Sequence, residues 1–216
     1  MGITPSITIS DSFAIGYNTP IATATSSIHL GVGNHFLLAR NGRGKTTLLK
    51  TLSGGLKAKS GEYKSNGRLQ FVNEFLEFDR EITPATVFKA LVPKKRRKQA
   101  LEMAETVELD YRKPFGRLSR GNRQKSLLIL AECRTADEQA PILLLDEPFT
   151  GLDAFTQDFF LNHWSGNTSN TLRLITCHPD SDEAEFPSVI TISDAELHHL
   201  NPESDRHWGA LKTALN

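Results

Sequence analysis

The chain has 216 residues, of which 38% are hydrophobic and 23% are charged, and its formal net charge is zero. This composition predicts a packed soluble domain, and the balanced charge argues against general nucleic-acid binding. The start, MGITPSITIS, lacks the basic and apolar segments of a signal peptide, and no apolar run approaches the roughly 20 residues that cross a bilayer. A function at a membrane would therefore need membrane spans from another chain.

The first third of the chain alternates short β-like runs with turns. The predicted strands are SITIS, FAIGY, SSIHLGV and HFLLA, and the last of these ends at Ala39. A helix is expected to follow the loop at Asn41 and to run to about Leu52, where SGG breaks it. The stretch GEYKSNGRLQFV is predicted to form two strands around a turn at Asn66 and Gly67.

Helical patterns dominate the middle of the chain, and strands return after it. From about Thr83 to Leu109 the pattern is helical, and SLLILAECR is a second, apolar helix. PILLLDEP, LRLIT and SVITIS are typical of short buried strands, and DRHWGALKTAL near the end is predicted to be an amphipathic helix. Strands that alternate with helices indicate an α/β fold with a mostly parallel sheet.

The segment ARNGRGKTT, which starts at Ala39, has the form of a phosphate-binding loop between a strand and a helix. Gly44 would let backbone N–H groups approach phosphate oxygens, Lys45 would reach the β- and γ-phosphates, and the Thr46 hydroxyl would ligate magnesium. The alternative is an ordinary glycine-containing turn before a helix. The residues expected to contact nucleotide are Asn41, Gly42, Arg43, Gly44, Lys45, Thr46 and Thr47.

A second acidic motif supports the phosphate loop. ILLLDE places Asp146 at the end of an apolar strand, where a phosphate-loop enzyme needs an acid to hold magnesium. Glu147 follows directly and is in place to polarise an attacking water. Either motif alone could be a solvated turn or strand end, but the two together favour a nucleotide hydrolase.

Three further segments, in their order along the chain, give this sequence a family resemblance. LSRGNRQ precedes the Asp146 strand, FTGLD follows it, and LITCHPD places His178 just after the next strand. From roughly Tyr17 to His178 the chain resembles the ATP-binding cassette (ABC) family of ATPases, and specifically the small ATP-binding subunits of ABC transporters of exporter-like type. LSRGNRQ is similar to the family's signature motif, with Ser119 and Gly121 at its matching positions.

The resemblance implies a phosphate-loop fold and a set of site residues. Residues 1–216 would form one nucleotide-binding domain with an N-terminal antiparallel β subdomain and an inserted helical subdomain at about 75–130. ATP and Mg²⁺ would be the ligands. Asp153 would match the acid of the D-loop, His178 would match the switch histidine, and Tyr17 would stack on adenine.

The family also implies that two such domains face head to tail and complete each other's nucleotide sites. Ser119, Gly121 and the Asn122 region would then act on the partner's nucleotide, with Glu147, His178 and Lys45 as catalytic residues. Because this chain carries both halves of a site, we expect a homodimer, with a heterodimer as the alternative.

Three positions depart from the family pattern. Ala39 replaces the first glycine of the phosphate loop; it adds only a methyl group, so close approach is retained if its φ is negative. Arg120 replaces a signature glycine and either binds the partner's γ-phosphate or faces solvent. Glu74 stands near the place of a glutamine that touches magnesium; a carboxylate suits this cation, and we expect slow or partner-dependent hydrolysis.

The leading hypothesis is an ATP-hydrolysing subunit that drives a separate transmembrane permease, with export as the expected direction. The chain would then lie peripherally on the cytoplasmic side of the membrane, with membrane contact through the permease and no nucleic-acid partner. The apolar residues Phe75, Leu76 and Phe78 would either receive a permease helix or pack the subdomain's own core. The alternatives are a soluble ABC ATPase, for example in cluster assembly, and a degenerate nucleotide-binding regulator.

Overall fold

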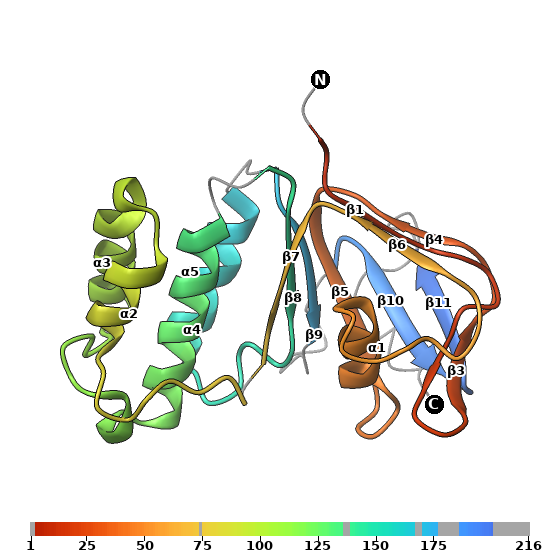
Figure 1. Ribbon diagram of the computed structural model, residues 1–216, viewed down its shortest axis with the longest axis horizontal. Coiled ribbons are helices and arrows are strands. Elements are labelled where there is room, and N and C mark those ends of the chain that lie inside the picture. Colours follow the sequence, from red (N-terminus) through yellow and green to blue (C-terminus); the bar gives the residue numbers. More distant parts are fainter. Residues whose placement is uncertain (1–2, 74, 136–138, 167–169, 177–185, 201–216) are drawn as a thin grey trace. The chain divides into compact units, whose positions relative to one another are not determined.

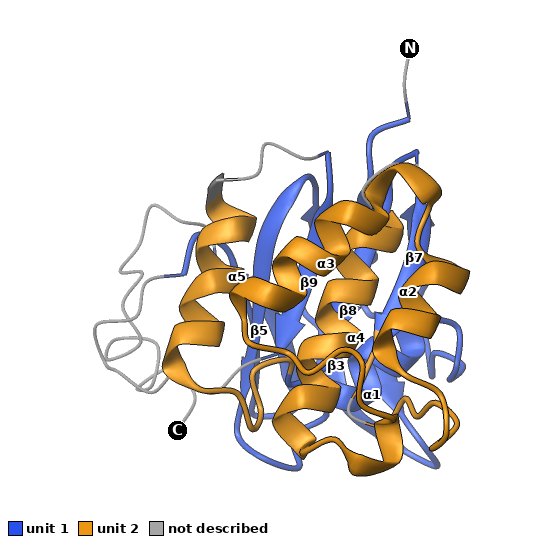
Figure 2. Cartoon of the chain, turned by 90° about the vertical axis from the view of Figure 1, so that its left-hand side faces the viewer, with its two compact units in different colours: residues 1–71, 139–147, 170–216 blue, residues 72–138, 148–169 orange. Residues whose placement is uncertain are grey.

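A computed structural model describes most of the chain as two compact units (Figure 1). The described residues are 3–73, 75–135, 139–166, 170–176 and 186–200. Unit 1 comprises residues 1–71, 139–147 and 170–216, and unit 2 comprises residues 72–138 and 148–169. Figure 2 shows that the two units differ in kind, because unit 1 holds nearly all the strands and unit 2 is mainly helical. The helix predicted for DRHWGALKTAL lies outside the described residues.

A small antiparallel sheet forms near the N-terminus of unit 1. It has the order β4-β1-β6, with β4 at Ile28–Leu30, β1 at Ser6–Ile9 and β6 at Tyr63–Asn66. Alternate residues of β1 are fully buried, namely Ile7 and Ile9, as expected of a strand with one face on the core.

The second sheet is larger and carries the strands that precede the candidate site. Its order is β2-β3-β11-β10-β5-β9-β8-β7. The strands are β2 (Ala14–Gly16), β3 (Pro20–Ala24), β11 (Glu196–Leu200), β10 (Val189–Ser193), β5 (Gly33–Ala39), β9 (Leu172–Thr176), β8 (Pro141–Leu145) and β7 (Arg68–Val72). The four consecutive strands β10, β5, β9 and β8 are parallel, and β8 and β9 are buried along their whole length. Their carboxyl ends therefore meet at one edge of the sheet.

The strands on either side of Asn66 and Gly67 exist, but the prediction that they surround a hairpin turn is wrong. β6 pairs with β1, whereas β7 joins the edge of the larger sheet beside β8. Gly67 has φ of 145°, and a Cβ on it would lie 2.2 Å from the backbone oxygen of Ala140. The chain therefore crosses between sheets at a close backbone contact that only glycine permits.

Helices α2 to α5 belong to unit 2, and α1 belongs to unit 1 (Figure 2). The helices are α1 (Lys45–Leu52), α2 (Pro84–Leu91), α3 (Arg97–Thr106), α4 (Arg120–Thr135) and α5 (Ala154–Gly166), with 3₁₀ turns η1 (Lys94–Arg96) and η2 (Phe115–Arg117). The helical pattern predicted from about Thr83 to Leu109 forms two helices, α2 and α3, with a break at Val92 and Pro93. Val92 adopts an extended ψ of 133°, as sterically favoured before proline.

The predicted fold class is confirmed: a mostly parallel sheet carries the phosphate loop, an antiparallel β element lies near the N-terminus, and a helical unit is inserted. Within the described part of the chain, no helix has both the length and the hydrophobicity to span a bilayer.

Candidate functional site

The candidate phosphate loop connects the end of β5 to the start of α1 in unit 1. Gly42 and Gly44 have φ values of 77° and 108°. A Cβ on Gly44 would lie 2.9 Å from Cδ1 of Ile21, a side-chain end that can shift, so it is the positive φ that disfavours larger residues at this position. Ala39 is buried as the last residue of β5, and it is not among the described non-glycine residues with positive φ. The backbone of Ala39 is therefore compatible with alanine in place of the first glycine of the phosphate loop.

The side chain of Lys45 turns back over this loop. Its Nζ donates to the backbone oxygen of Ala39 at 3.0 Å and lies 3.4 Å from Oδ1 of Asn41, and the residue is only 6% exposed. A lysine in this position places a positive charge among the loop amides, where an anion would bind. Thr47, on the first turn of α1, is also buried.

Asp146 follows β8 and lies close to the start of α1. The Thr46 hydroxyl and the Thr176 hydroxyl both form hydrogen bonds with its carboxylate, the latter at 3.1 Å. Burial raises the pKa of Asp146, while these two hydrogen bonds and the positive charge of Lys45 act in the opposite direction. Unit 1 therefore brings together Lys45, Thr46 and Asp146, as the sequence predicted for a nucleotide-bound cation.

Glu147 has an unusual backbone conformation. Its φ is 48°, in the left-handed region that is uncommon for a non-glycine residue. Its backbone N–H donates to Oγ1 of Thr176 at 2.6 Å. The fully buried Thr176 hydroxyl therefore accepts from Glu147 and donates to Asp146, and it orients both acids. Thr176 was missed from the sequence, although a polar residue at the end of the apolar run LRLIT is a usable signal.

The predicted magnesium ligands can be tested against the chemistry of the donors. Mg²⁺ prefers oxygen ligands and is usually held by one or two carboxylates, water and substrate phosphates. Thr46 and Asp146 supply a hydroxyl and a carboxylate at one point, so they fit this cation. Among the described residues no three His, Cys, Asp or Glu side chains form a metal cluster, as is usual when phosphates complete the site.

Tyr17 lies on the turn between β2 and β3, with 56% of its surface exposed. Gly44 packs against Ile15 of β2 and Ile21 of β3, so this hairpin lies beside the phosphate loop. An exposed aromatic ring at this place is available for stacking on a base.

The predicted signature residues begin α4 in unit 2. Oγ of Ser119 accepts from the backbone N–H of Asn122 at 3.2 Å, so Ser119 caps the helix, and its side chain is exposed. Arg120 is also exposed. Gly121 packs closely on the following loop, because a Cβ there would lie 2.5 Å from the backbone oxygen of Gly151.

Asp153 caps α5. Its Oδ1 accepts from the backbone N–H of Thr156 at 2.8 Å, and its Oδ2 lies 3.2 Å from Nζ of Lys125. The hydrogen bonds from Thr156, assisted by Lys125, lower the pKa of Asp153 to about 2. The predicted residues Glu74 and His178 lie outside the described residues.

A cavity of about 350 Å³ lies within unit 2 near the predicted partner segment. Phe75 is 74% exposed and Leu76 is 42% exposed, whereas Phe78 packs on Phe115 with ring centroids 5.1 Å apart. The two phenylalanines therefore differ: Phe78 is half-buried against Phe115, and Phe75 is on the surface. The cavity is lined by Leu76, Glu77, Phe78, Arg80, Phe115, Gly116, Arg120, Arg123, Gln124 and Leu127.

The sequence matches a known family over more than half of its length. Residues 28–150 match the family model described as ABC transporter. This range contains the phosphate loop, the signature segment and the Asp146–Glu147 pair.

Among the individual relatives, some are named as import proteins and others as export proteins. The chain is 33% identical over 178 residues to a zinc import ATP-binding protein of Aliivibrio fischeri, covering 79% of this chain and 64% of the relative. It is 38% identical over 119 residues to a cytochrome c biogenesis ATP-binding export protein of Zymomonas mobilis, covering 53% of this chain and 51% of the relative. A manganese transport system ATP-binding protein of Listeria monocytogenes is 25% identical, with 86% of each chain covered. The chain thus spans between about half and two thirds of the first two relatives.

Solved structures share the fold at low sequence identity. An ABC transporter ATP-binding protein from Pyrococcus furiosus matches with a TM-score of 0.70 and 24% identity, covering 87% of this chain and 97% of that one. A bacterial Atm1-family ABC exporter with ATP bound matches with a TM-score of 0.77 and 17% identity, covering all of this chain and 41% of that one. At these identities the likeness concerns the fold alone.

Proposed function

The chain belongs to the ABC transporter family, and from this premise we propose that it binds and hydrolyses ATP to drive a transporter. We assign residues 1–216 to one nucleotide-binding domain, with the helical subdomain at about 75–130. The observation that carries this proposal is the convergence of Lys45, Thr46 and Asp146, because a phosphate loop and a strand-end acid form one cation and phosphate site.

In the proposed reaction, water attacks the γ-phosphate in line with the leaving oxygen, and ADP and phosphate are released. The loop amides and Lys45 hold the β- and γ-phosphates, while Thr46 and Asp146 hold magnesium. Magnesium, when bound, supplies charge neutralisation to the phosphate oxygens. Glu147 accepts a proton from the attacking water, and Thr176 holds its backbone in place. Tyr17 stacks on the adenine.

A second copy of the chain completes each site in this proposal. Ser119, at the N-terminus of α4, and Gly121 would face the partner's γ-phosphate, since helix N-termini favour anions. Asp153 would lie at the same interface. His178 contacting the γ-phosphate and Glu74 approaching magnesium stay predictions for residues outside the described part of the chain.

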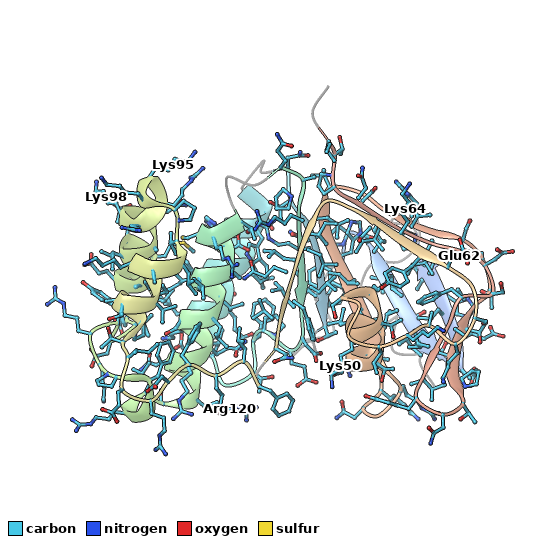
Figure 3. The ribbon with its side chains drawn as sticks, viewed as in Figure 1. Lys50, Glu62, Lys64, Lys95, Lys98 and Arg120 are labelled. Carbon is cyan, nitrogen blue, oxygen red and sulfur yellow. The ribbon has the colours of Figure 1, made fainter. Side chains whose placement is uncertain are left out.

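Magnesium-dependent ATP hydrolysis by the purified chain tests this function. We expect steady release of phosphate by the wild type, and a loss of at least about a hundredfold for Glu147→Gln. Glu62→Gln is the matched control, because Glu62 is an exposed glutamate in unit 1 (Figure 3). A wild type that shows no turnover even together with its membrane partner, or a Glu147→Gln variant as fast as the control, would contradict the proposal.

The transporter role requires a membrane partner, and we propose a separate permease that docks at the Phe75 surface beside the cavity of unit 2. The exposure of Phe75 and Leu76 supports a partner site there. The chain would then be peripheral on the cytoplasmic face of the membrane. Export remains the predicted direction, although the relatives carry names of both import and export systems.

Purification of tagged protein from gently solubilised membranes of its own cells tests the partner. A stoichiometric multi-spanning protein should accompany the wild type and a control variant, Ile3→Ser, which alters another exposed apolar residue. Phe75→Ser should recover less of it. If no membrane protein accompanies the wild type, the soluble ABC ATPase becomes the better account.

A further inference from the structure

Three contacts within unit 2 hold the loop of residues 148–153 against one face of α4. A Cβ on Gly121 would lie 2.5 Å from the backbone oxygen of Gly151, so the two backbones touch. Nε2 of Gln124 donates to the backbone oxygen of Pro148 at 2.9 Å. Nζ of Lys125 lies 3.2 Å from Oδ2 of Asp153. The helical positions 121, 124 and 125 are three and four residues apart, so they lie on the same face.

Lys125 is the centre of this arrangement because its ammonium group is buried. The residue is 9% exposed, and its Nζ also donates to the backbone oxygen of Val107 at 2.7 Å. Val107 is the C-cap of α3, where a carbonyl lacks a partner within the helix. A buried ammonium group is tolerated only when it is paired with an opposite charge and hydrogen-bonded. Lys125 therefore needs both of its contacts, the one with Asp153 and the one with Val107.

Asp153 connects the same lysine to the start of α5. Its two carboxylate oxygens have different partners: Oδ1 accepts from the backbone N–H of Thr156, and Oδ2 meets Lys125. One ammonium group therefore joins the end of α3, the body of α4 and the beginning of α5. By contrast, the pair of Lys98 and Glu102 lies on the surface, with the Lys98 side chain 90% exposed.

We propose that Lys125 is a positioning residue for ATP hydrolysis, which holds the loop 148–153 in fixed register with the signature segment at the start of α4. This inference rests on the proposed function, in which Ser119 and Asp153 both act at the partner's nucleotide. The two segments then approach that nucleotide as one rigid element. Lys125 itself touches neither nucleotide nor magnesium and acts through Asp153.

Amide hydrogen exchange tests the positioning without requiring turnover. Lys125→Met is compared with wild type and with Lys98→Met, a control at the end of unit 2 opposite Arg120 (Figure 3). We expect the amides of residues 149–156 to exchange at least about tenfold faster in Lys125→Met, with the middle of α4 unchanged. Equal exchange in the two variants would overturn the proposal.

Kinetics distinguish positioning from a general structural role. Lys125→Met should lower kcat by at least about tenfold, because small displacements cost large factors in rate, while KM for ATP stays within about twofold. Lys125→Arg, which retains the charge and several donors, should recover most of the turnover. A parallel loss of kcat and nucleotide affinity, or no rescue by arginine, would overturn the proposal.

Asp153→Asn provides a variant that keeps the fold if Lys125→Met does not. Asparagine still caps α5 but loses the charge that pairs with Lys125. We expect a lowered kcat, and the double variant should be no slower than the slower single variant, because both changes break one contact. Additive losses would overturn the proposal. Absence of turnover in the wild type together with its membrane partner would instead contradict the proposed function, and the exchange measurement would still decide the role of Lys125.

Discussion

The hydroxyl of Thr176, at the end of β9, donates to the carboxylate of Asp146 at 3.1 Å and accepts the backbone N–H of Glu147 at 2.6 Å. This one buried side chain fixes the orientation of Asp146, the proposed magnesium ligand, and the backbone of Glu147, the proposed general base. Glu147 is held at a positive φ that costs about 1–3 kcal/mol when it is not supported by its surroundings. This conformation of Glu147 is supported by Thr176, which lies on β9, the parallel strand next to β8.

Replacing Thr176 with valine should therefore impair hydrolysis. The variant keeps the shape but leaves the buried carboxylate of Asp146 and the partly buried N–H of Glu147 without this partner, so we expect a loss of about 1–3 kcal/mol in the free energy of unfolding. The rate of phosphate release should fall at least about tenfold as Glu147 loses its position. Thr176→Ser, which keeps the hydroxyl, is the control. Wild-type behaviour of Thr176→Val in both denaturation and turnover would be inconsistent with this role.

The alanine that departs from the phosphate-loop pattern should be neutral for nucleotide binding. Ala39 has an ordinary strand conformation, so Ala39→Gly should change the Kd for ATP by less than about threefold and should destabilise the protein by about 0.5–1 kcal/mol. Thermal unfolding and titration with a fluorescent ATP analogue measure the two effects. An Ala39→Gly variant that binds at least tenfold more tightly would show that the methyl group restricts the loop.

Gly44→Ala is the matched contrast, because the same methyl group is added at a backbone conformation that disfavours it. Gly44 has φ of 108°, and a Cβ would lie 2.9 Å from Ile21. The backbone strain of about 1–3 kcal/mol should weaken ATP binding by tenfold or more. Unchanged binding in this variant would mean that the loop rearranges freely.

Stability should fall at mildly acidic pH because of a buried histidine chain in unit 1. Nε2 of His35 lies 2.9 Å from the backbone oxygen of Gly31, its Nδ1 lies 2.8 Å from Oγ of Ser188, and Ser188 lies 2.9 Å from Nε2 of His199. The Gly31 carbonyl can only accept, so neutral His35 carries its proton on Nε2. Burial lowers the pKa of His35 and of His199, and charges on His199 and His29 lower that of His35 further.

Because the pKa values of His35 and His199 are lowered, the protein should lose stability as the pH falls. Because the folded-state pKa values lie below the unfolded value of about 6.5, protons bind preferentially to the unfolded chain. Stability is therefore complete above about pH 6.5 and is lost as the pH falls through the folded-state pKa values. The midpoint of thermal unfolding should drop over this range less steeply for His35→Asn than for His198→Asn, a control at a half-exposed histidine outside this hydrogen-bonded chain. Identical pH profiles would exclude His35 as the cause.

Local chemistry made much of the site predictable. The phosphate loop and the Asp146–Glu147 pair depend on short motifs that follow apolar strands, so residue order alone predicted Lys45, Thr46 and Asp146 as neighbours. Thr176 was missed because its role arises only when β9 pairs beside β8. Lys125 was missed for a similar reason, since its two acceptors lie 18 and 28 positions away in the chain.

The errors in the fold also have physical causes. Asn-Gly usually favours a hairpin, but pairing of β6 with β1 and of β7 with the larger sheet overrides this local preference. The helical region from Thr83 to Leu109 is divided at Pro93, because proline disfavours helix at the preceding residue. Strands β3 and β11 were not predicted. The sequence of β11 is ELHHL, and its polar residues do not give the apolar run or alternation that is typical of a strand.

Binding of MgATP to the purified chain is the decisive test of the proposed nucleotide site. Wild type, Lys45→Ala and Lys50→Ala are titrated with a fluorescent ATP analogue; Lys50 lies in the last turn of the same helix and serves as the control (Figure 3). The account predicts that Lys45→Ala binds at least about tenfold more weakly than wild type, whereas Lys50→Ala binds normally. Equal binding by all three proteins, or no binding by the wild type, would contradict it.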